Sequence, residues 1–340
     1  RINMGFKKVL WCIAFCLCGH VVLAQDARFT QQYANRLYLN PAFAGLDRSW
    51  SVSLAHRSQW PTLNGSFVTN QLTADYRFEG TKSAVSLLLQ QDRAGIGGLQ
   101  KLQATGGYAY HTNLTSGWAM SAGLQASVAS LRVNFDNLVF GDQLSDNGQV
   151  ALTSAEANRF DPTSYLSFTV GGLVYSDQFW AGITASNLNK PGYGFGEKTE
   201  LPINFTVVTG YKFFMRSYEE QGRLFELSFT PSVTYVRQQE FNRVDIGLHT
   251  IYTPVTLGLI YKGVPVVGET NQDQAFAVIA GLQLEQFRIG YSHDVGLKGL
   301  SRHAGGANEI SIVFEQLAIN KLFRSRLGRK INRNIVCPAF

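Results

Sequence analysis

The side chains best suited to acid–base or metal chemistry are five histidines that follow the first 24 residues: His56, His111, His249, His293 and His303. None of them stands in an H-E-x-x-H pattern, and no G-x-S-x-G supplies a nucleophile. A hydrolase with a Ser/His pair stays open as an alternative, because two residues far apart in sequence can meet in a fold. Isolated histidines on different strands and loops are the simpler interpretation. We therefore expect no enzyme activity, no bound metal and no cofactor.

Two loops resemble ligand-binding motifs without completing them. In "GDQLSDNGQ", Asp142, Asp146 and Asn147 offer oxygen ligands for calcium, but their spacing does not match an EF-hand. In "DRAGIGG", glycines follow a strand, yet no helix follows them as a dinucleotide site requires. A solvated loop and a hairpin loop are the favoured interpretations.

The start of the chain is typical of an export signal. Lys7 and Lys8 precede an apolar run over 9–22, and Val22-Leu23-Ala24 resembles a signal-peptidase site. An uncleaved inner-membrane anchor is the alternative, but polar residues follow the run directly. We expect residues 1–24 to be a signal peptide.

Cysteine and charge usage exclude other classes. Three of the four cysteines lie in the leader, so the mature chain keeps Cys337 alone and forms no internal disulfide. The leader contributes +3 and six basic residues after Glu315 contribute +6 to the net charge of +6, so the body between them is about −3. A basic tail on an exported chain does not indicate nucleic acid as a partner.

After the leader, apolar and polar residues alternate with the period of a β-strand. Along "LFELSFTPSVTYV" one face is apolar and the other is polar, with Phe225, Leu227, Phe229, Val233 and Tyr235 against Glu226, Ser228, Thr230, Ser232 and Thr234. No later apolar run is long enough for a membrane helix. Such strands fit either a soluble β protein or a barrel that separates lipid from a polar lumen.

The connections favour the barrel. Fourteen strands are predicted, an even number, and short links such as "EGT", "TSG" and "SD" alternate with long ones over 133–163, 188–202, 263–273 and 294–307. The expected strands are 50–57, 68–78, 82–91, 101–113, 117–131, 164–176, 178–187, 203–215, 224–236, 243–252, 254–262, 274–284, 286–293 and 308–315. The sequence thus predicts an all-β, 14-stranded antiparallel transmembrane barrel of the outer membrane over 46–316. Short turns and both termini are expected in the periplasm.

The segment before the first strand, 25–45, is expected to be a plug or lid. Phe29, Tyr33 and Leu37 fall on one stripe of a helix, and the turn at Asn40-Pro41 forces the chain to become extended. A periplasmic flap that shields the end of the lumen is the alternative.

Several stretches carry a resemblance to a known family: "FTQQYANRLYLNPAFAG", "HRSQWPTLNG", "QQDRAGIGGLQ", "FRIGYSHDVGLKGLSRHAGGANEISIVF" and the ending "NIVCPAF". The chain resembles the PorP/SprF family of the Bacteroidota type IX secretion system. The resemblance implies an outer-membrane barrel of the fatty-acid-transporter (FadL) type that serves secretion, surface display or gliding. The implied partners are secreted cargo with a C-terminal signal domain, other type IX components and outer-membrane lipid. A FadL-like transporter of a hydrophobic small molecule is the alternative function.

The candidate partner-binding residues fall in three places. The opening segment contributes Phe29, Tyr33, Leu37, Asn40 and Pro41, and the end of the first strand contributes His56 and Arg57 to a possible mouth. A basic tail, 317–340, interleaves positive and apolar residues and ends as the family does, which adds Arg329, Lys330, Arg333, Cys337, Pro338 and Phe340.

Overall fold

Antiparallel strands make up almost all of the protein. The computed structural model describes residues 28–46, 49–95, 98–133, 139–144, 154, 161–195, 199–220, 223–239, 241–264, 274–284, 286–298 and 302–315. The strands of the main sheet are β1 (Trp50–Gln59), β2 (Phe67–Arg77), β3 (Ser83–Ala94), β4 (Leu99–Asn113), β5 (Ala119–Val133), β6 (Thr163–Tyr175), β7 (Phe179–Ser186), β10 (Asn204–Tyr211), β11 (Phe213–Glu220), β12 (Arg223–Gln238), β13 (Phe241–Tyr252), β14 (Val255–Val264), β15 (Ala275–Leu284), β16 (Phe287–Gly296) and β17 (Ala307–Glu315). A small separate ladder joins β8 (Gly192–Tyr193) to β9 (Thr199–Glu200).

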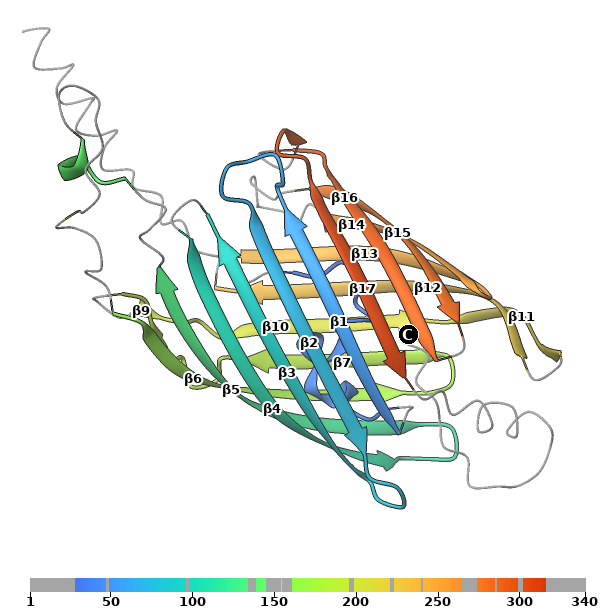
Figure 1. The fold of residues 1–340 in the computed structure, drawn as a ribbon. Coiled ribbons are helices and arrows are strands. Elements are labelled where there is room, and N and C mark those ends of the chain that lie inside the picture. The colour runs from blue at the N-terminus through green and yellow to red at the C-terminus, as the bar shows by residue number, and fades with distance from the viewer. Residues whose placement is uncertain are drawn as a thin grey trace, which may run out of the picture.

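The main sheet closes into a barrel (Figure 1). Its first and last strands, β1 and β17, pair over nine residues, and β10 pairs with β7 on one side and β12 on the other. Although the sheet contains fifteen strands, β10 and β11 follow one another along the chain and both pair with β12. The ring therefore has fourteen strand positions, as the sequence predicts.

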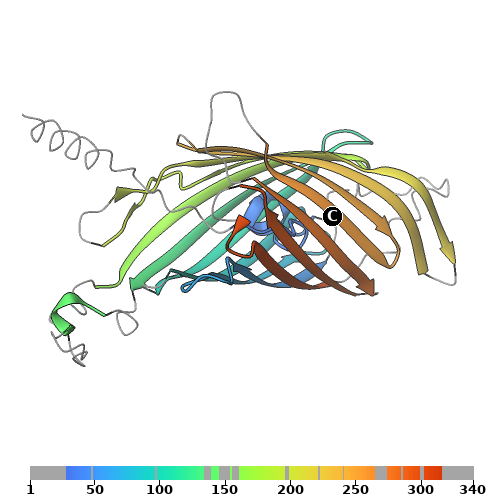
Figure 2. The same ribbon diagram turned by 90° about the horizontal axis from the view of Figure 1, so that it is seen from above.

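One predicted strand differs in its extent. The expected strand over 203–215 is divided at Lys212 into β10 and β11, and β11 continues to Glu220. The expected connection over 216–223 is therefore mostly strand, with a bulge between Phe214 and Arg216. Because β11 pairs with β12 alone, the two strands project from one end of the barrel (Figure 2).

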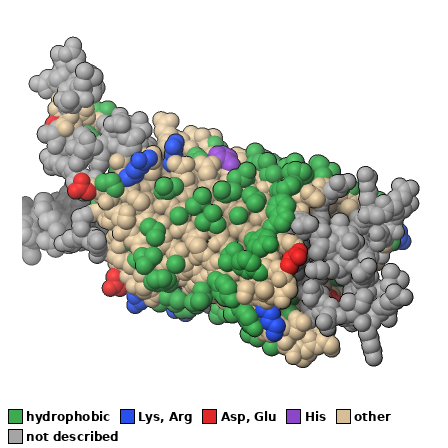
Figure 3. Space-filling view, turned by 60° about the horizontal axis from the view of Figure 1, so that its bottom comes forward, with side chains coloured by type: hydrophobic (Ala, Val, Ile, Leu, Met, Phe, Trp, Pro, Cys, Tyr) green, Lys and Arg blue, Asp and Glu red, His purple; other side chains and the backbone are tan. Residues whose placement is uncertain are grey.

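The two faces of the wall match the predicted alternation. On β12, Ser228, Thr230 and Thr234 are buried on the inside, while Val233 is 38% exposed on the outside. On β2, Thr69, Gln71, Thr73 and Asp75 are likewise buried. Figure 3 shows hydrophobic side chains in patches across the middle of the face, and charged ones toward its edges. An apolar outer face and a polar interior are what a barrel in lipid requires.

The connections differ between the two ends of the barrel. At one end the links are 78–82, 114–118, 176–178, 221–222, 253–254 and 285–286, which we call the short-turn end. The links over 134–162, 187–203, 265–274 and 297–306 lie at the other end, the long-loop end, together with 60–66 and two short links at 95–98 and 239–240. In the described part of the chain, no helix is both long and apolar enough to cross a membrane.

The segment from Arg28 to Leu46, which we call the inner segment, lies inside the ring of strands (Figures 1 and 2). It contains one helical turn, α2 (Arg36–Leu39), and one 3-10 turn, η1 (Pro41–Phe43). The predicted helical stripe is wrong, because the chain before Arg36 is not helical. Tyr33 and Leu37 are nonetheless buried, each in a different apolar cluster.

Candidate functional site

The interior of the barrel holds a cluster of four buried charges. Arg57 on β1, Lys262 on β14, Asp294 on β16 and Glu309 on β17 form this interior ion cluster. Arg57 lies 2.7 Å from Asp294 and 3.3 Å from Glu309, and Lys262 lies 2.7 Å from Asp294. Two cations balance two carboxylates, which offsets the loss of solvation that isolated buried charges would suffer.

The inner segment begins on this cluster. The backbone N–H groups of Thr30 and Gln31 donate to the two oxygens of Glu309, at 2.6 and 3.0 Å. The Thr30 hydroxyl donates to Asp294 at 2.8 Å and accepts from Lys262. These charge-assisted hydrogen bonds fix the first described residues to the wall.

A second ion pair fixes the other part of the inner segment. Arg36 lies 2.8 Å from Asp75 on β2, whose carboxylate also accepts from the Ser51 hydroxyl and from the backbone N–H of Gly45 at 2.7 Å. The Asp75 side chain is 1% exposed. One carboxylate therefore ties both ends of the stretch 36–45 to the barrel.

Asn40 joins the inner segment to the strand backbones. Its side-chain nitrogen donates to the carbonyl oxygens of Gly172 and Ile183, at 3.1 and 3.2 Å. Its side-chain oxygen accepts from the N–H of Ala42 at 2.8 Å and so caps η1, where Pro41 is pre-set for the first turn.

Wall glycines make room for this turn. A Cβ at Gly171 would lie 2.1 Å from the Asn40 side-chain oxygen, and one at Gly123 would lie 2.5 Å from the Pro41 backbone. A Cβ at Gly290 would lie 1.8 Å from the Tyr33 hydroxyl oxygen. Any other residue at these places would push the inner segment away from the wall.

Tyr33 sits between the segment and the strands. Its hydroxyl donates to the Gln31 side chain at 2.6 Å, and the Arg288 guanidinium lies 5.2 Å from its ring centre. Burial raises the pKa of the Tyr33 phenol, so the hydroxyl stays a donor. Phe29 instead packs edge-on against Tyr38, with ring centres 5.7 Å apart.

The structure separates His56 from Arg57. Arg57 points into the barrel, whereas His56 is exposed on the outer wall with its ring Nδ1 2.8 Å from Asn70. The two residues therefore do not form one mouth, because neighbours on a strand point to opposite faces. The tail candidates Arg329, Lys330, Arg333, Cys337, Pro338 and Phe340 lie outside the described residues.

Other residues singled out from the sequence make ordinary hydrogen bonds within the chain. His111 contacts the Ala44 carbonyl oxygen at 2.8 Å, and the Asp142 carboxylate accepts from Ser154 at 2.7 Å. Asp146 and Asn147 lie outside the described residues. Within the described ranges, no group of three His, Cys, Asp or Glu side chains is arranged to hold a metal.

Sequence reasoning missed the acidic residues that hold the inner segment. The period-two alternation along 68–78 puts Asp75 on the inner face with Thr69 and Gln71, but it does not single out Asp294 and Glu309. An inward-facing acid within a strand of mostly small polar residues is the available signal. Its partner lies 39 positions away for Asp75 with Arg36 but 252 positions away for Glu309 with Arg57, so the signal does not name the pair.

Family comparison decides what kind of barrel this is. The model of the family described as type IX secretion system membrane protein PorP/SprF matches residues 21–314. The chain belongs to the PorP/SprF family. This PorP/SprF protein is thus an outer-membrane β-barrel of the type IX secretion system family. Comparison with curated proteins finds no match.

Solved structures with a similar course of the chain have little sequence in common with this PorP/SprF barrel. The Ralstonia pickettii toluene transporter TbuX is 11% identical, with a TM-score of 0.44, over 82% of this chain and 93% of that one. The Acinetobacter baumannii outer membrane protein Omp33 is 9% identical, with a TM-score of 0.44, over 80% and 99%. The P. putida toluene transporter TodX is 12% identical, with a TM-score of 0.40, over 81% and 92%.

Proposed function

We propose that this barrel docks or anchors a protein secreted by the type IX system, such as a surface adhesin or other cargo with a C-terminal signal domain. The role supports secretion, surface display or gliding, and it involves no catalysis. Membership of the PorP/SprF family over residues 21–314 is the observation that carries the proposal. The buried attachment of the inner segment adds support, because it favours a fixed scaffold.

The alternative is a FadL-like transporter of a hydrophobic small molecule. A transporter of that class needs a continuous apolar path through the lumen. The buried inward-facing residues here include Ser53, Thr69, Gln71, Thr105 and Ser127, which do not form such a path. The inner segment also occupies part of the lumen, where the Arg36–Asp75 pair and the interior ion cluster hold it. Both features favour docking over transport.

We expect the cargo to bind away from the contacts that hold the inner segment in the lumen. Tyr33, Leu37, Asn40, Pro41 and Arg57 all contact the chain's own residues and are buried. We assign them the positioning of the inner segment. The long-loop end and the basic tail are left as the surfaces for cargo and for type IX components, with the short-turn end in the periplasm.

Truncation of the tail tests the proposal. A variant ending at Asn320 lacks Arg329, Lys330, Arg333 and the final Cys337-Pro338-Ala339-Phe340. We expect the barrel to fold and reach the outer membrane, while display of the cargo on the cell surface is lost. Heat-modifiable migration in a gel reports the folded barrel, and surface labelling reports the cargo. Normal display after truncation would argue against docking through the tail.

A matched pair of assays separates docking from transport. Wild type and a strain lacking the barrel are compared for cargo display and for uptake of a hydrophobic tracer. Docking predicts lost display and unchanged uptake in the deleted strain. Reduced uptake with normal display would favour the transporter.

A further inference from the structure

One strand of the barrel has an edge that no other described strand covers. β11 pairs with β12 from Phe213 to Glu220, and in the part of the chain that the structure describes its opposite edge pairs with nothing. On that side the preceding residue, Lys212, still donates its N–H to the Gln178 carbonyl oxygen in a short turn, at 2.7 Å. Beyond it, β11 projects from the short-turn end with one edge open (Figures 1 and 2).

The open edge of β11 has the properties of a strand-binding site. Its free N–H and C=O groups can pair with an extended segment, and proteins usually keep such edges short, charged or covered. The side chains beside the edge are apolar and exposed: Phe213 by 50%, Met215 by 67% and Tyr218 by 47%. The edge therefore suits a strand that brings apolar residues of its own.

The basic tail starts at the same end of the barrel. β17 ends at Glu315, whose N–H donates to the carbonyl oxygen of Gln286 in a short turn, at 2.9 Å. Six steps of the sheet separate β17 from β11, which at the usual strand spacing is about 29 Å along the wall. About nine extended residues cover that distance, and the tail over 317–340 has 24. The second half of the tail can therefore reach the open edge.

The second half of the tail has residues that suit a strand. In the stretch 329–336, "RKINRNIV", Ile331 and Ile335 fall on the same face of an extended chain, and Pro338 follows, where a strand would have to stop. The charges also match, because the sequence of β11 ends in two glutamates, whereas the chain after Glu315 has six basic residues and no acidic one.

We propose that residues 329–336 of the basic tail add to the open edge of β11 as a further strand. The tail is tethered to the same barrel, so its effective concentration at the edge is on the order of millimolar, which favours it over a separate molecule. In a dimer with its two-fold axis along the membrane normal, two β11 strands with the usual tilt would cross at about 70–90°, an angle at which strands do not pair. The contact goes beyond the proposed docking of cargo and does not depend on it.

A photo-crosslinking amino acid at Met215, in cells that express the full chain, tests the contact directly. We expect a link within one chain, which migrates as a monomer and which peptide mass spectrometry assigns to residues 329–340. The matched control is Tyr110 on β4, which is 46% exposed and forms no link with the tail if the contact is specific to β11. A link between two copies, a link to another protein or to lipid alone, no link at Met215, or equal tail links at both sites would each overturn the proposal.

Proline in the tail tests whether the contact is a strand pairing. Adjacent N–H groups of a strand point to opposite edges, so Ile331→Pro with Asn332→Pro removes one donor toward β11 whatever the register. We expect the Met215 link to fall at least tenfold while the heat-modifiable barrel is retained, and Ile331→Val with Asn332→Thr to keep the link. An undiminished link in the proline variant would overturn the proposal. If that variant does not fold, a barrel ending at Asn320 is mixed with a synthetic peptide of 329–340, which should link to Met215, and with its proline version, which should not.

Discussion

Arg57 on the first strand lies 2.7 Å from Asp294 on the last but one, and both side chains are 8% exposed inside the barrel. The two residues are 237 positions apart in sequence and meet only because the barrel closes. Thr30 of the inner segment binds both of them, since its hydroxyl donates to Asp294 and accepts from Arg57 at 3.0 Å. Closure of the barrel and seating of the inner segment therefore depend on the same side chains.

Arg57→Met tests this dependence. The change leaves two buried carboxylates with Lys262 alone, and breaking a buried pair costs about 3–5 kcal/mol. We expect the free energy of unfolding in detergent, followed by heat-modifiable migration over a urea series, to fall by that order. Arg132→Met is the control, because Arg132 is exposed and bonds Gln100 at the rim. Similar losses of unfolding free energy in both variants would mean that the interior ion cluster stabilises the barrel no more than an exposed contact does.

Substitutions at two neighbouring glycines test how closely the inner segment packs against the wall. A Cβ at Gly171 would lie 2.1 Å from Asn40, whereas at Gly172 it would meet nothing within 4 Å. Gly171→Ala is expected to destabilise the barrel by about 1–3 kcal/mol, as overpacking does. Gly172→Ala should change stability by less than about 0.5 kcal/mol. Urea unfolding measures both changes in stability. Equal effects would contradict the conclusion that Gly171 leaves space for Asn40.

Labelling in intact cells tests the orientation. Arg28 stacks on Phe241, with its guanidinium 4.9 Å from the ring centre, and β13 starts there, at the long-loop end. If the long loops face outside, Arg28→Cys should react with an impermeant maleimide, while Ser176→Cys in a short turn should not. Labelling of Ser176→Cys and not of Arg28→Cys would mean that the short turns face outside. The expectation that both termini lie at the short-turn end stays a prediction, because the described chain begins at Arg28 and ends at Glu315.

Deleting Gln25–Asn40 tests whether the inner segment limits permeation. The deletion removes Arg36 and Asn40 from the lumen but leaves the strands, so a folded barrel with higher single-channel conductance is expected. Loss of the bonds to Glu309 and Asp75 should also lower its urea midpoint. Unchanged conductance in planar bilayers would show that the segment does not narrow the path.

A charge on the outer wall tests the register. Leu259 on β14 is 58% exposed toward lipid, and an arginine near the midplane costs about 2–4 kcal/mol. Leu259→Arg should lower the unfolding free energy in lipid vesicles by that order, and Leu259→Val should be nearly neutral. A tolerated arginine would indicate that this face is not in contact with lipid.

The sequence alone determined the strands and their two faces. A period of two is a local property, because each side chain points opposite to its neighbours, and so the inner positions of Thr69, Gln71 and Asp75 could be read directly. Loop lengths and family stretches then favoured a fourteen-position barrel of the PorP/SprF type.

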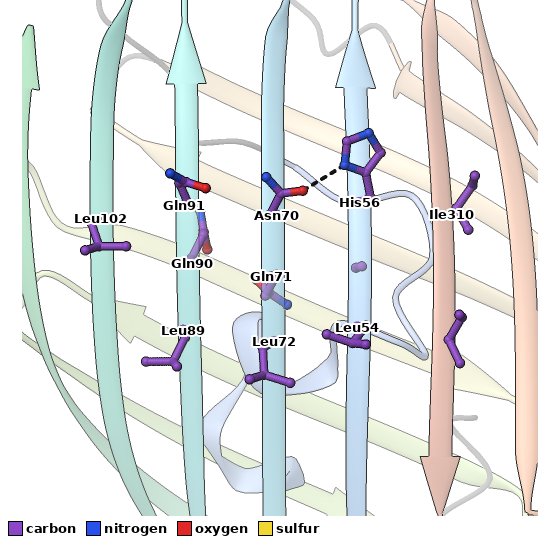
Figure 4. Close-up of a pocket in the computed structure, with 12 residues that line it drawn as sticks. Leu54, His56, Asn70, Gln71, Leu72, Leu89, Gln90, Gln91, Leu102 and Ile310 are labelled. Carbon is purple, nitrogen blue, oxygen red and sulfur yellow. Dashed lines mark hydrogen bonds between the residues drawn. The ribbon is translucent and has the colours of Figure 1, made fainter. Parts of the chain in front are cut away.

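Only the tertiary structure decided what the inner segment binds. Glu309 and Asp75 reach it from β17 and β2, and Gly171 and Gly290 leave space for Asn40 and Tyr33. Such partners depend on strand order, register and barrel closure, which bring distant residues together without a local pattern. The same reason explains why His56, adjacent to Arg57, is exposed on the outer wall beside Asn70 (Figure 4).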